Sequence, residues 1–177
     1  RGDTQFSSTL FKLAVKLKPN DHFLRKKLVV ELIRKGDLEE ARENLVGLAH
    51  EELQDDPSMA LILAGVYTAE EKTIEARKVY EKVLKKHPKN EEACVFLAKN
   101  LSSEGESKKA FKLLSRCQKR SPKAPIFSYY RGKIYLSLEN FKAARKAFKE
   151  ALKIDSKYYQ ASLAIGLMLE EKGHYKK

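Results

Sequence analysis

Residues 57–88 read PSMALILAGVYTAEEKTIEARKVYEKVLKKHP, and this stretch decides the fold. Its first half carries apolar residues at helical steps of three and one, namely Met59, Ile62, Leu63, Val66 and Tyr67. A polar break at residues 70–73 is followed by a second stripe, which consists of Ile74, Ala76, Val79, Tyr80, Val83 and Leu84. Pro88 comes next, where a helix must end. The stretch therefore predicts two amphipathic helices joined by a turn, and no period-two alternation predicts a strand.

The same arrangement returns every 34 residues. Alanines stand at positions 76, 110 and 144, and prolines at positions 88 and 122. Bulky residues recur as Tyr80, Leu114 and Phe148, and smaller ones as Val83, Cys117 and Ala151. After one extra residue, the series continues backwards through Ala41, Leu45 and Leu48. A period of this length indicates a repeat protein, in which neighbouring units stack because no unit can bury its apolar face alone.

These units resemble the tetratricopeptide repeat. That pattern asks for a leucine and a small residue, an aromatic residue further along the first helix, and then alanine, an aromatic residue and proline. One unit supplies Leu63, Ala64, Tyr67, Ala76, Tyr80 and Pro88. The next unit has Leu97, Ala98, Leu101, Ala110, Leu114 and Pro122, and the third has Gly132, Tyr135, Ala144, Phe148 and Ala151, with Arg131 in the leucine place. The resemblance implies an all-α fold, a right-handed α-solenoid of stacked antiparallel helix pairs that coil into a superhelix.

We expect a single array over residues 1–177. Full repeats are predicted at 22–56, 57–90, 91–124 and 125–158. Residues 1–21 match the second helix of a preceding repeat, and residues 159–177 supply another first helix that ends near Tyr175. Both ends then fall within a repeat, and we expect the chain to be part of a longer protein.

No catalytic, cofactor or metal site is predicted. The sequence has no glycine-rich phosphate loop and no nucleophile elbow, and its four histidines share no helix face at ligand spacing. We therefore expect a non-enzymatic protein without cofactors. Cys94 and Cys117 fall on the two helices of one repeat. We interpret both as free thiols lining the core, which suits a reducing cytoplasm, and a disulfide is the alternative.

The resemblance also implies a binding surface. In this family peptides bind along the concave wall that the first helices form, and the outward positions there are Leu61, Val95, Lys99, Ile126, Tyr129, Lys133, Leu163 and Leu167. Exposed apolar residues usually mark an interface, and lysines beside them suit carboxylates. We therefore expect a protein or peptide partner with apolar anchors and acidic neighbours, held chiefly by Tyr129. The alternatives are that tight curvature buries this row or that a chain terminus fills the groove.

The net charge of +12 is concentrated in one part of the chain. Residues 106–157 hold fifteen Lys and Arg against four Asp and Glu. Six lysines recur with the period on the second helices, where they should face the convex side: Lys78, Lys85, Lys112, Lys119, Lys146 and Lys153. These lysines would attract nucleic acid, an anionic surface or an acidic protein. Nucleic acid is the less favoured of these, because no aromatic residues lie between the lysines to stack on bases. The alternative is that the lysines are ordinary solvated residues of an outer helix face. Self-association through the open end repeats is a third hypothesis.

Overall fold

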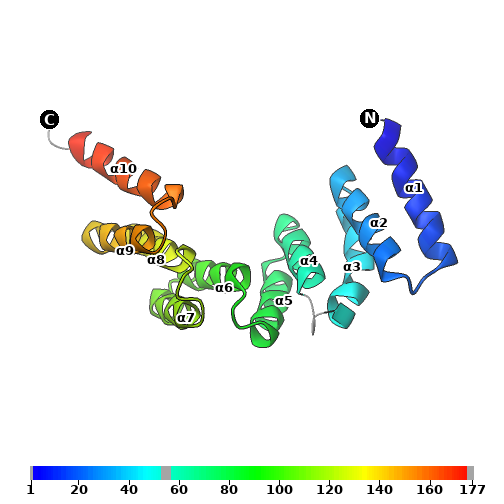
Figure 1. The fold of residues 1–177 in the computed structure, drawn as a ribbon, viewed down its shortest axis with the longest axis horizontal. Coiled ribbons are helices and arrows are strands. Elements are labelled where there is room, and N and C mark those ends of the chain that lie inside the picture. Colours follow the sequence, from blue (N-terminus) through cyan, green and yellow to red (C-terminus); the bar gives the residue numbers. More distant parts are fainter. Residues whose placement is uncertain (1, 53–56, 175–177) are drawn as a thin grey trace. The chain divides into compact units, whose positions relative to one another are not determined.

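The structure of the chain is a computed structural model that describes residues 2–52 and 57–174. Within these ranges the chain is helical and contains no strand, which confirms the predicted all-α fold. Figure 1 shows the ten helices, which are α1 (Gly2–Leu17), α2 (His22–Lys35), α3 (Leu38–Glu52), α4 (Ser58–Ala69), α5 (Thr73–Lys86), α6 (Glu91–Ser103), α7 (Ser107–Arg120), α8 (Ile126–Ser137), α9 (Phe141–Ile154) and α10 (Tyr159–His174). None of these described helices is both long and apolar enough to cross a lipid bilayer.

The chain divides into two compact units, Arg1–His87 and Pro88–Lys177. Unit 1 holds α1 to α5, and unit 2 holds α6 to α10. Short turns join antiparallel partners, which are α2 with α3 and α4 with α5 in unit 1, and α6 with α7 and α8 with α9 in unit 2. Each pair lies inside one of the predicted repeat ranges. Residues 53–56, which end the repeat predicted at 22–56, and Tyr175 lie outside the described residues.

The four pairs are joined by the same hydrogen-bonded turn. A backbone N–H donates to the carbonyl five residues earlier, as in Asp37 to Leu32 (2.9 Å), Lys72 to Tyr67 (2.8 Å), Glu106 to Leu101 (2.8 Å) and Asn140 to Tyr135 (2.9 Å). The N–H just before it donates to the carbonyl three residues back, which completes a Schellman closure of the helix end. Each first helix of a pair therefore ends by the same local rule.

The Schellman closure needs one residue in the left-handed region, and this residue recurs with the sequence period: Gly36 (φ 86°), Glu71 (φ 59°), Gly105 (φ 79°) and Glu139 (φ 56°). Glycine adopts this conformation freely, whereas it costs another L-residue roughly 1 kcal/mol. Gly36 and Gly105 are therefore the residue type that this position favours. Because Glu71 and Glu139 adopt it too, the packing of the two helices imposes the turn even where the local residue opposes it.

The repeated columns of the second helices lie in the core of each unit, together with apolar residues of the first helices. The buried members are Ala41, Leu45, Leu48, Ala76, Tyr80 and Val83 in unit 1, and Ala110, Leu114, Cys117, Ala144, Phe148 and Ala151 in unit 2. The first helices place small residues where they approach the second ones. At Gly132 a Cβ atom would lie 2.5 Å from the ring of Phe148. The absence of a side chain at Gly132 therefore sets how closely α8 approaches α9.

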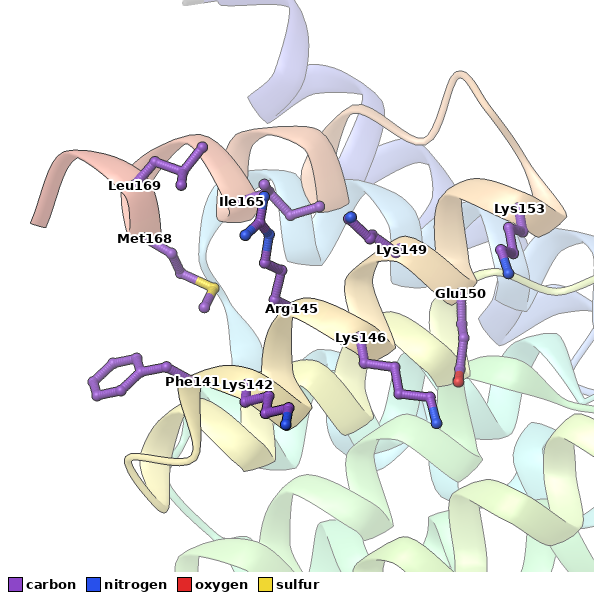
Figure 2. A pocket seen from close by; sticks show the side chains of 10 residues that line it. All are labelled: Phe141, Lys142, Arg145, Lys146, Lys149, Glu150, Lys153, Ile165, Met168 and Leu169. Atoms are coloured by element: carbon purple, nitrogen blue, oxygen red, sulfur yellow. The ribbon is translucent and has the colours of Figure 1, made fainter. Parts of the chain in front are cut away.

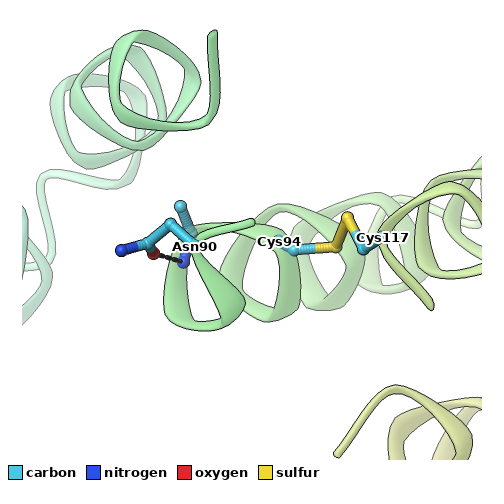
Figure 3. The surroundings of a disulfide bond; sticks show 4 residues. Asn90, Cys94 and Cys117 are labelled. Atoms are coloured by element: carbon cyan, nitrogen blue, oxygen red, sulfur yellow. Dashed lines mark hydrogen bonds between the residues drawn. A yellow bond between two sulfur atoms is a disulfide. The ribbon is translucent and has the colours of Figure 1, made fainter. Parts of the chain in front are cut away.

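The two cysteines form a disulfide, so the expectation of two free thiols is wrong. The bond joins Cys94 of α6 to Cys117 of α7, and Figure 3 shows it between these helices, one turn beyond the Asn90 side chain that caps α6. The two helices of one repeat bring the Cα atoms to 6.7 Å, a separation that a disulfide can bridge. Both cysteines are buried. Free thiols therefore no longer support a reducing compartment for this chain.

Polar partners hold Arg131, which stands where the repeat pattern has leucine. Its Nη2 atom donates to Glu150 Oε2 of α9 at 3.0 Å and to Ser128 Oγ at 3.0 Å. The Ser128 hydroxyl donates in turn to Gln118 Oε1 of α7 at 3.3 Å. This network links α7, α8 and α9 within unit 2. It takes the place of the apolar packing expected of a leucine.

Candidate functional site

A cleft of about 260 Å³ lies in unit 2 and is lined by three helices. Helix α8 contributes Tyr129, Lys133 and Leu136, and α9 contributes Phe148. Helix α10 contributes Gln160, Leu163, Ala164, Leu167 and Met168. We call this hollow the Tyr129 cleft. Its volume is below the roughly 300–1,000 Å³ of pockets for small molecules, so it suits one apolar side chain of a larger ligand.

Helical spacing brings the lining residues together. Tyr129 and Lys133 are four residues apart on α8, so they lie on one face of that helix. Leu163 and Leu167 have the same spacing on α10. Although both leucines are apolar, Leu163 is 60% exposed and Leu167 is 53% exposed. The wall that α10 gives to the Tyr129 cleft is therefore apolar and open to solvent.

Tyr129 is fixed in place by other aromatic rings. Its centroid lies 5.3 Å from that of Tyr130, 5.6 Å from that of Phe148 and 5.6 Å from that of Tyr158. Tilted and edge-to-face arrangements at such distances are favourable. Phe148 cannot shift easily, because it is fully buried beside Gly132. Tyr129 therefore has little conformational freedom left to lose when a ligand binds.

Lys133 supplies the positive charge of the Tyr129 cleft. It is exposed, and none of the described residues that line the cleft is acidic. The Tyr158 hydroxyl nearby is neutral at physiological pH, because burial and then the neighbouring Tyr129 raise the pKa of Tyr158 to about 12. The described His, Cys, Asp and Glu side chains form no group of three or more that would hold a metal ion. The cleft thus combines an apolar wall, the ring of Tyr129 and one cation.

Four of the predicted partner-binding residues meet in the cleft, namely Tyr129, Lys133, Leu163 and Leu167. The other four do not line it. Val95 is 7% exposed and belongs to the core of α6, so its side chain is not available at a surface. Ile126 is partly buried at the start of α8, and Lys99 is exposed on α6. Leu61 lies partly buried on α4 of unit 1.

The predicted convex lysines are all exposed: Lys78, Lys85, Lys112, Lys119, Lys146 and Lys153. Two of them, Lys146 and Lys153, line a second and larger cleft of about 520 Å³ between α9 and α10. Arg145 and Lys149 line this cleft as well (Figure 2), and neither is among the six periodic lysines. The sequence period alone therefore does not predict the cleft.

The sequence does not point to several residues of the Tyr129 cleft. The sequence period marks Phe148 as a core residue, like Tyr80 and Leu114, and not as a residue that lines a cleft. The one signal in the sequence for its place in the cleft is the small residue opposite it on α8, Gly132. Helical spacing assigns Gln160, Ala164 and Met168 to the same face as Leu163 and Leu167 only when it is known that α10 begins at Tyr159.

The fold of the chain is similar to that of solved helical repeat proteins. The crystal structure of MamA matches with a TM-score of 0.71 and 20% sequence identity, and the match covers 90% of this chain and 92% of the MamA chain. TTC0263, a thermophilic TPR protein of Thermus thermophilus, has a TM-score of 0.67 and 19% identity, with 95% and 91% covered. YrrB, a TPR protein with an unusual peptide-binding site, has a TM-score of 0.67 and 16% identity, with 93% and 84% covered. No curated protein matches the chain. The fold places the chain in the class of α-solenoid repeat proteins.

Two family models match the sequence. The model of the tetratricopeptide repeat matches residues 131–177, and the model of the anaphase-promoting complex, cyclosome, subunit 3, matches residues 70–151. Together they span residues 70–177, more than half of the chain. These matches confirm the resemblance to the tetratricopeptide repeat that the repeating columns predicted.

Proposed function

We propose that the chain is a non-enzymatic scaffold that binds a peptide or partner protein through the Tyr129 cleft. One observation carries this proposal: four of the eight residues that the sequence predicted for partner binding line a single hollow with an exposed apolar wall. Such a surface usually marks an interaction site. The similar fold of YrrB, a protein with a peptide-binding site, supports the same role.

The ligand that suits the cleft is a segment with an apolar side chain next to an acidic one. Burial of one leucine or phenylalanine side chain contributes about 1.5–3 kcal/mol. Lys133, which lines the cleft, would pair with a carboxylate beside that anchor. Because one anchor gives only weak binding after the entropy of association is subtracted, the ligand must extend along α8 and α10 beyond the cleft.

The experiment selects peptides from a random displayed library on the purified chain and measures the Kd of the strongest by fluorescence anisotropy. We expect an apolar residue flanked by Asp or Glu in the selected sequences. Tyr129→Ala should weaken binding about 30-fold, as expected for the loss of a central aromatic anchor. Lys133→Glu should weaken it about tenfold, and a peptide with Lys in place of the acidic residue should bind the Lys133→Glu variant better than the wild type.

Two variants serve as controls. Tyr129→Phe keeps the ring that packs on Phe148 and should keep most of the affinity. Lys99→Glu makes the same charge change at the equivalent exposed position one repeat earlier, outside the cleft, and should have little effect. If the selected peptides bind Tyr129→Ala and Lys133→Glu as tightly as the wild type, the ligand site is not this cleft.

A further inference from the structure

The exposed side of α7 carries only positive charge. This helix, Ser107–Arg120, reads SKKAFKLLSRCQKR and contains no Asp or Glu. Its buried residues, Ala110, Leu114 and Cys117, face the rest of unit 2. Every exposed residue of α7 is a cation, and the six are Lys108, Lys109, Lys112, Arg116, Lys119 and Arg120. We call this surface the α7 basic face.

The α7 basic face does not owe its exposure to an end of the chain. Helix α7 lies inside the array, packs against both α6 and α8, and is followed by three further helices. Helix α10, which carries Glu170 and Glu171, packs against α9. Because repeats stack on their nearest neighbours, a further repeat after α10 would lie beyond α9 and α10. It would therefore leave the α7 basic face open.

Little negative charge lies beside this face. Of the two helices that pack on α7, α8 has no acidic residue, and α6 has Glu91 and Glu92 in its first turn. Glu106, directly before α7, forms an ion pair with Lys109 at 2.8 Å. Among the described residues, no carboxylate forms an ion pair with the other five cations of the face. Their charge is available to an anionic ligand.

The spacing of the cations suits a linear polyanion. Lys108, Lys112, Arg116 and Arg120 follow one another at steps of four residues, so each charge lies about 6 Å further along the helix. The row rises about 18 Å in all. One strand of a DNA duplex carries a phosphate for about every 3.4 Å of its axis, so the row spans about five phosphates. Arginine binds phosphate oxygens with two hydrogen bonds, and lysine binds them as a point charge.

We propose that the α7 basic face binds the phosphate backbone of a nucleic-acid duplex, without regard to base sequence. Single strands are held by aromatic rings that stack on bases, and Phe111 of α7 is not free for this because it packs on Tyr135 of α8 at 4.5 Å. A duplex needs no such ring, since its bases are already stacked and its backbone is bound by charge. This site is separate from the Tyr129 cleft and does not depend on the ligand proposed there.

Two other anionic partners fit the face less well. A basic amphipathic helix binds a lipid bilayer by burying its apolar side among the acyl chains, but the apolar side of α7 is already buried inside unit 2. A protein interface has a core of apolar and aromatic anchors, and no exposed side chain of α7 is apolar. Phosphate contacts by themselves account for non-specific binding to a duplex.

The probe is a fluorescein-labelled DNA duplex of mixed sequence and about 20 base pairs, longer than the row of cations. Fluorescence anisotropy measures its Kd for the chain between about 50 and 200 mM salt. Neutralisation of four to five phosphates predicts that log K falls with log salt with a slope of about −4. Lys112→Gln/Arg116→Gln removes two of these contacts, so the slope should become less steep by about 2, and binding should weaken at least about fivefold.

A matched variant separates this face from the total charge of the chain. Lys99→Gln/Lys133→Gln removes the same charge from exposed positions on α6 and α8, and it should leave the slope unchanged and the Kd within about twofold, because salt screens distant charges. Conversely, Lys112→Gln/Arg116→Gln should bind the peptides selected on the Tyr129 cleft as tightly as the wild type. All four side chains are exposed and glutamine suits a helix, so circular dichroism should show unchanged helix content.

Competition at equal concentrations of negative charge identifies the ligand. Unlabelled duplex of unrelated sequence should displace the probe at the lowest concentration. The proposal fails if vesicles of phosphatidylserine and phosphatidylcholine, poly-glutamate or single-stranded DNA displace the probe at a lower one, because the face would then suit that ligand better. It also fails if Lys112→Gln/Arg116→Gln keeps the Kd and the salt slope of the wild type.

Discussion

Gly132→Ala tests whether the close approach of α8 to α9 holds the Tyr129 cleft in shape. The added Cβ atom would lie 2.5, 2.6 and 2.9 Å from three ring carbons of Phe148. Because carbon atoms normally approach no closer than about 3.5 Å, the ring or the helix must move by about 1 Å. Phe148 is fully buried, so it has no solvent to move into. Overpacking of this kind costs about 1–3 kcal/mol.

The helix preference of alanine works in the opposite direction and must be measured separately. Alanine in a helix interior is more favourable than glycine by about 1 kcal/mol. Gly166→Ala in α10 isolates this gain, because a Cβ placed there meets no atom within 4 Å apart from the adjoining backbone of its own helix. We therefore expect Gly166→Ala to stabilise unit 2 and Gly132→Ala to be less stable than Gly166→Ala by about 1–3 kcal/mol.

Urea unfolding followed by far-ultraviolet circular dichroism measures both free energies of unfolding. A smaller side chain at position 148 should relieve the clash, because leucine leaves room for the new methyl group. The double variant Gly132→Ala/Phe148→Leu should therefore lose less free energy of unfolding than the two single variants lose in sum. If Gly132→Ala proves as stabilising as Gly166→Ala, the helices are not held at this distance, and the cleft is not preorganised by Phe148.

Two further predictions concern unit 2. Replacement of both cysteines, Cys94→Ser/Cys117→Ser, should lower the free energy of unfolding by about 3 kcal/mol, because the bond closes a loop with a sequence separation of 23 in the unfolded chain. Urea unfolding measures this loss. If the denatured, unreduced wild type contains two reactive thiols, the bond does not form. The second prediction is a dependence on alkaline pH: the pKa of Tyr158 is about 12 in the folded chain against 10.0 without its surroundings, so its contribution to stability is complete below pH 10 and is lost as the pH rises toward 12. The free energy of unfolding of wild type should therefore fall more steeply over this interval than that of Tyr158→Phe, and parallel curves would contradict the burial of this hydroxyl.

The helices could be predicted from the sequence because the same packing contact recurs in every repeat. Alanine at 76, 110 and 144 is buried each time, since the same two helices approach each other there. Exposure along the first helices is less regular, because it depends on the next helix. Helix α8 packs against α6, where Val95 is buried, whereas Leu163 on α10 remains exposed.

The disulfide and the left-handed conformation in two of the turns could not be predicted from residue type. Whether two buried cysteines can bond depends on their Cα separation to within about an ångström, and column spacing does not resolve that distance. The left-handed conformation of Glu71 and Glu139 is unfavourable for glutamate, so residue type argues against it. Only their alignment with Gly36 and Gly105 in the 34- to 35-residue period indicates it.

The hydrogen-bonded turns inside the repeats and the connections between repeats respond differently to added residues. A turn whose N–H groups must reach carbonyls three and five residues back has a fixed length, so a single insertion breaks it. The connections are not all of one length: residues 121–125 form a connection of five residues, whereas 87–90 and 155–158 have four each. Protein engineers who wish to add a tag, or to duplicate or delete a whole repeat, should therefore cut at these connections and keep every turn intact.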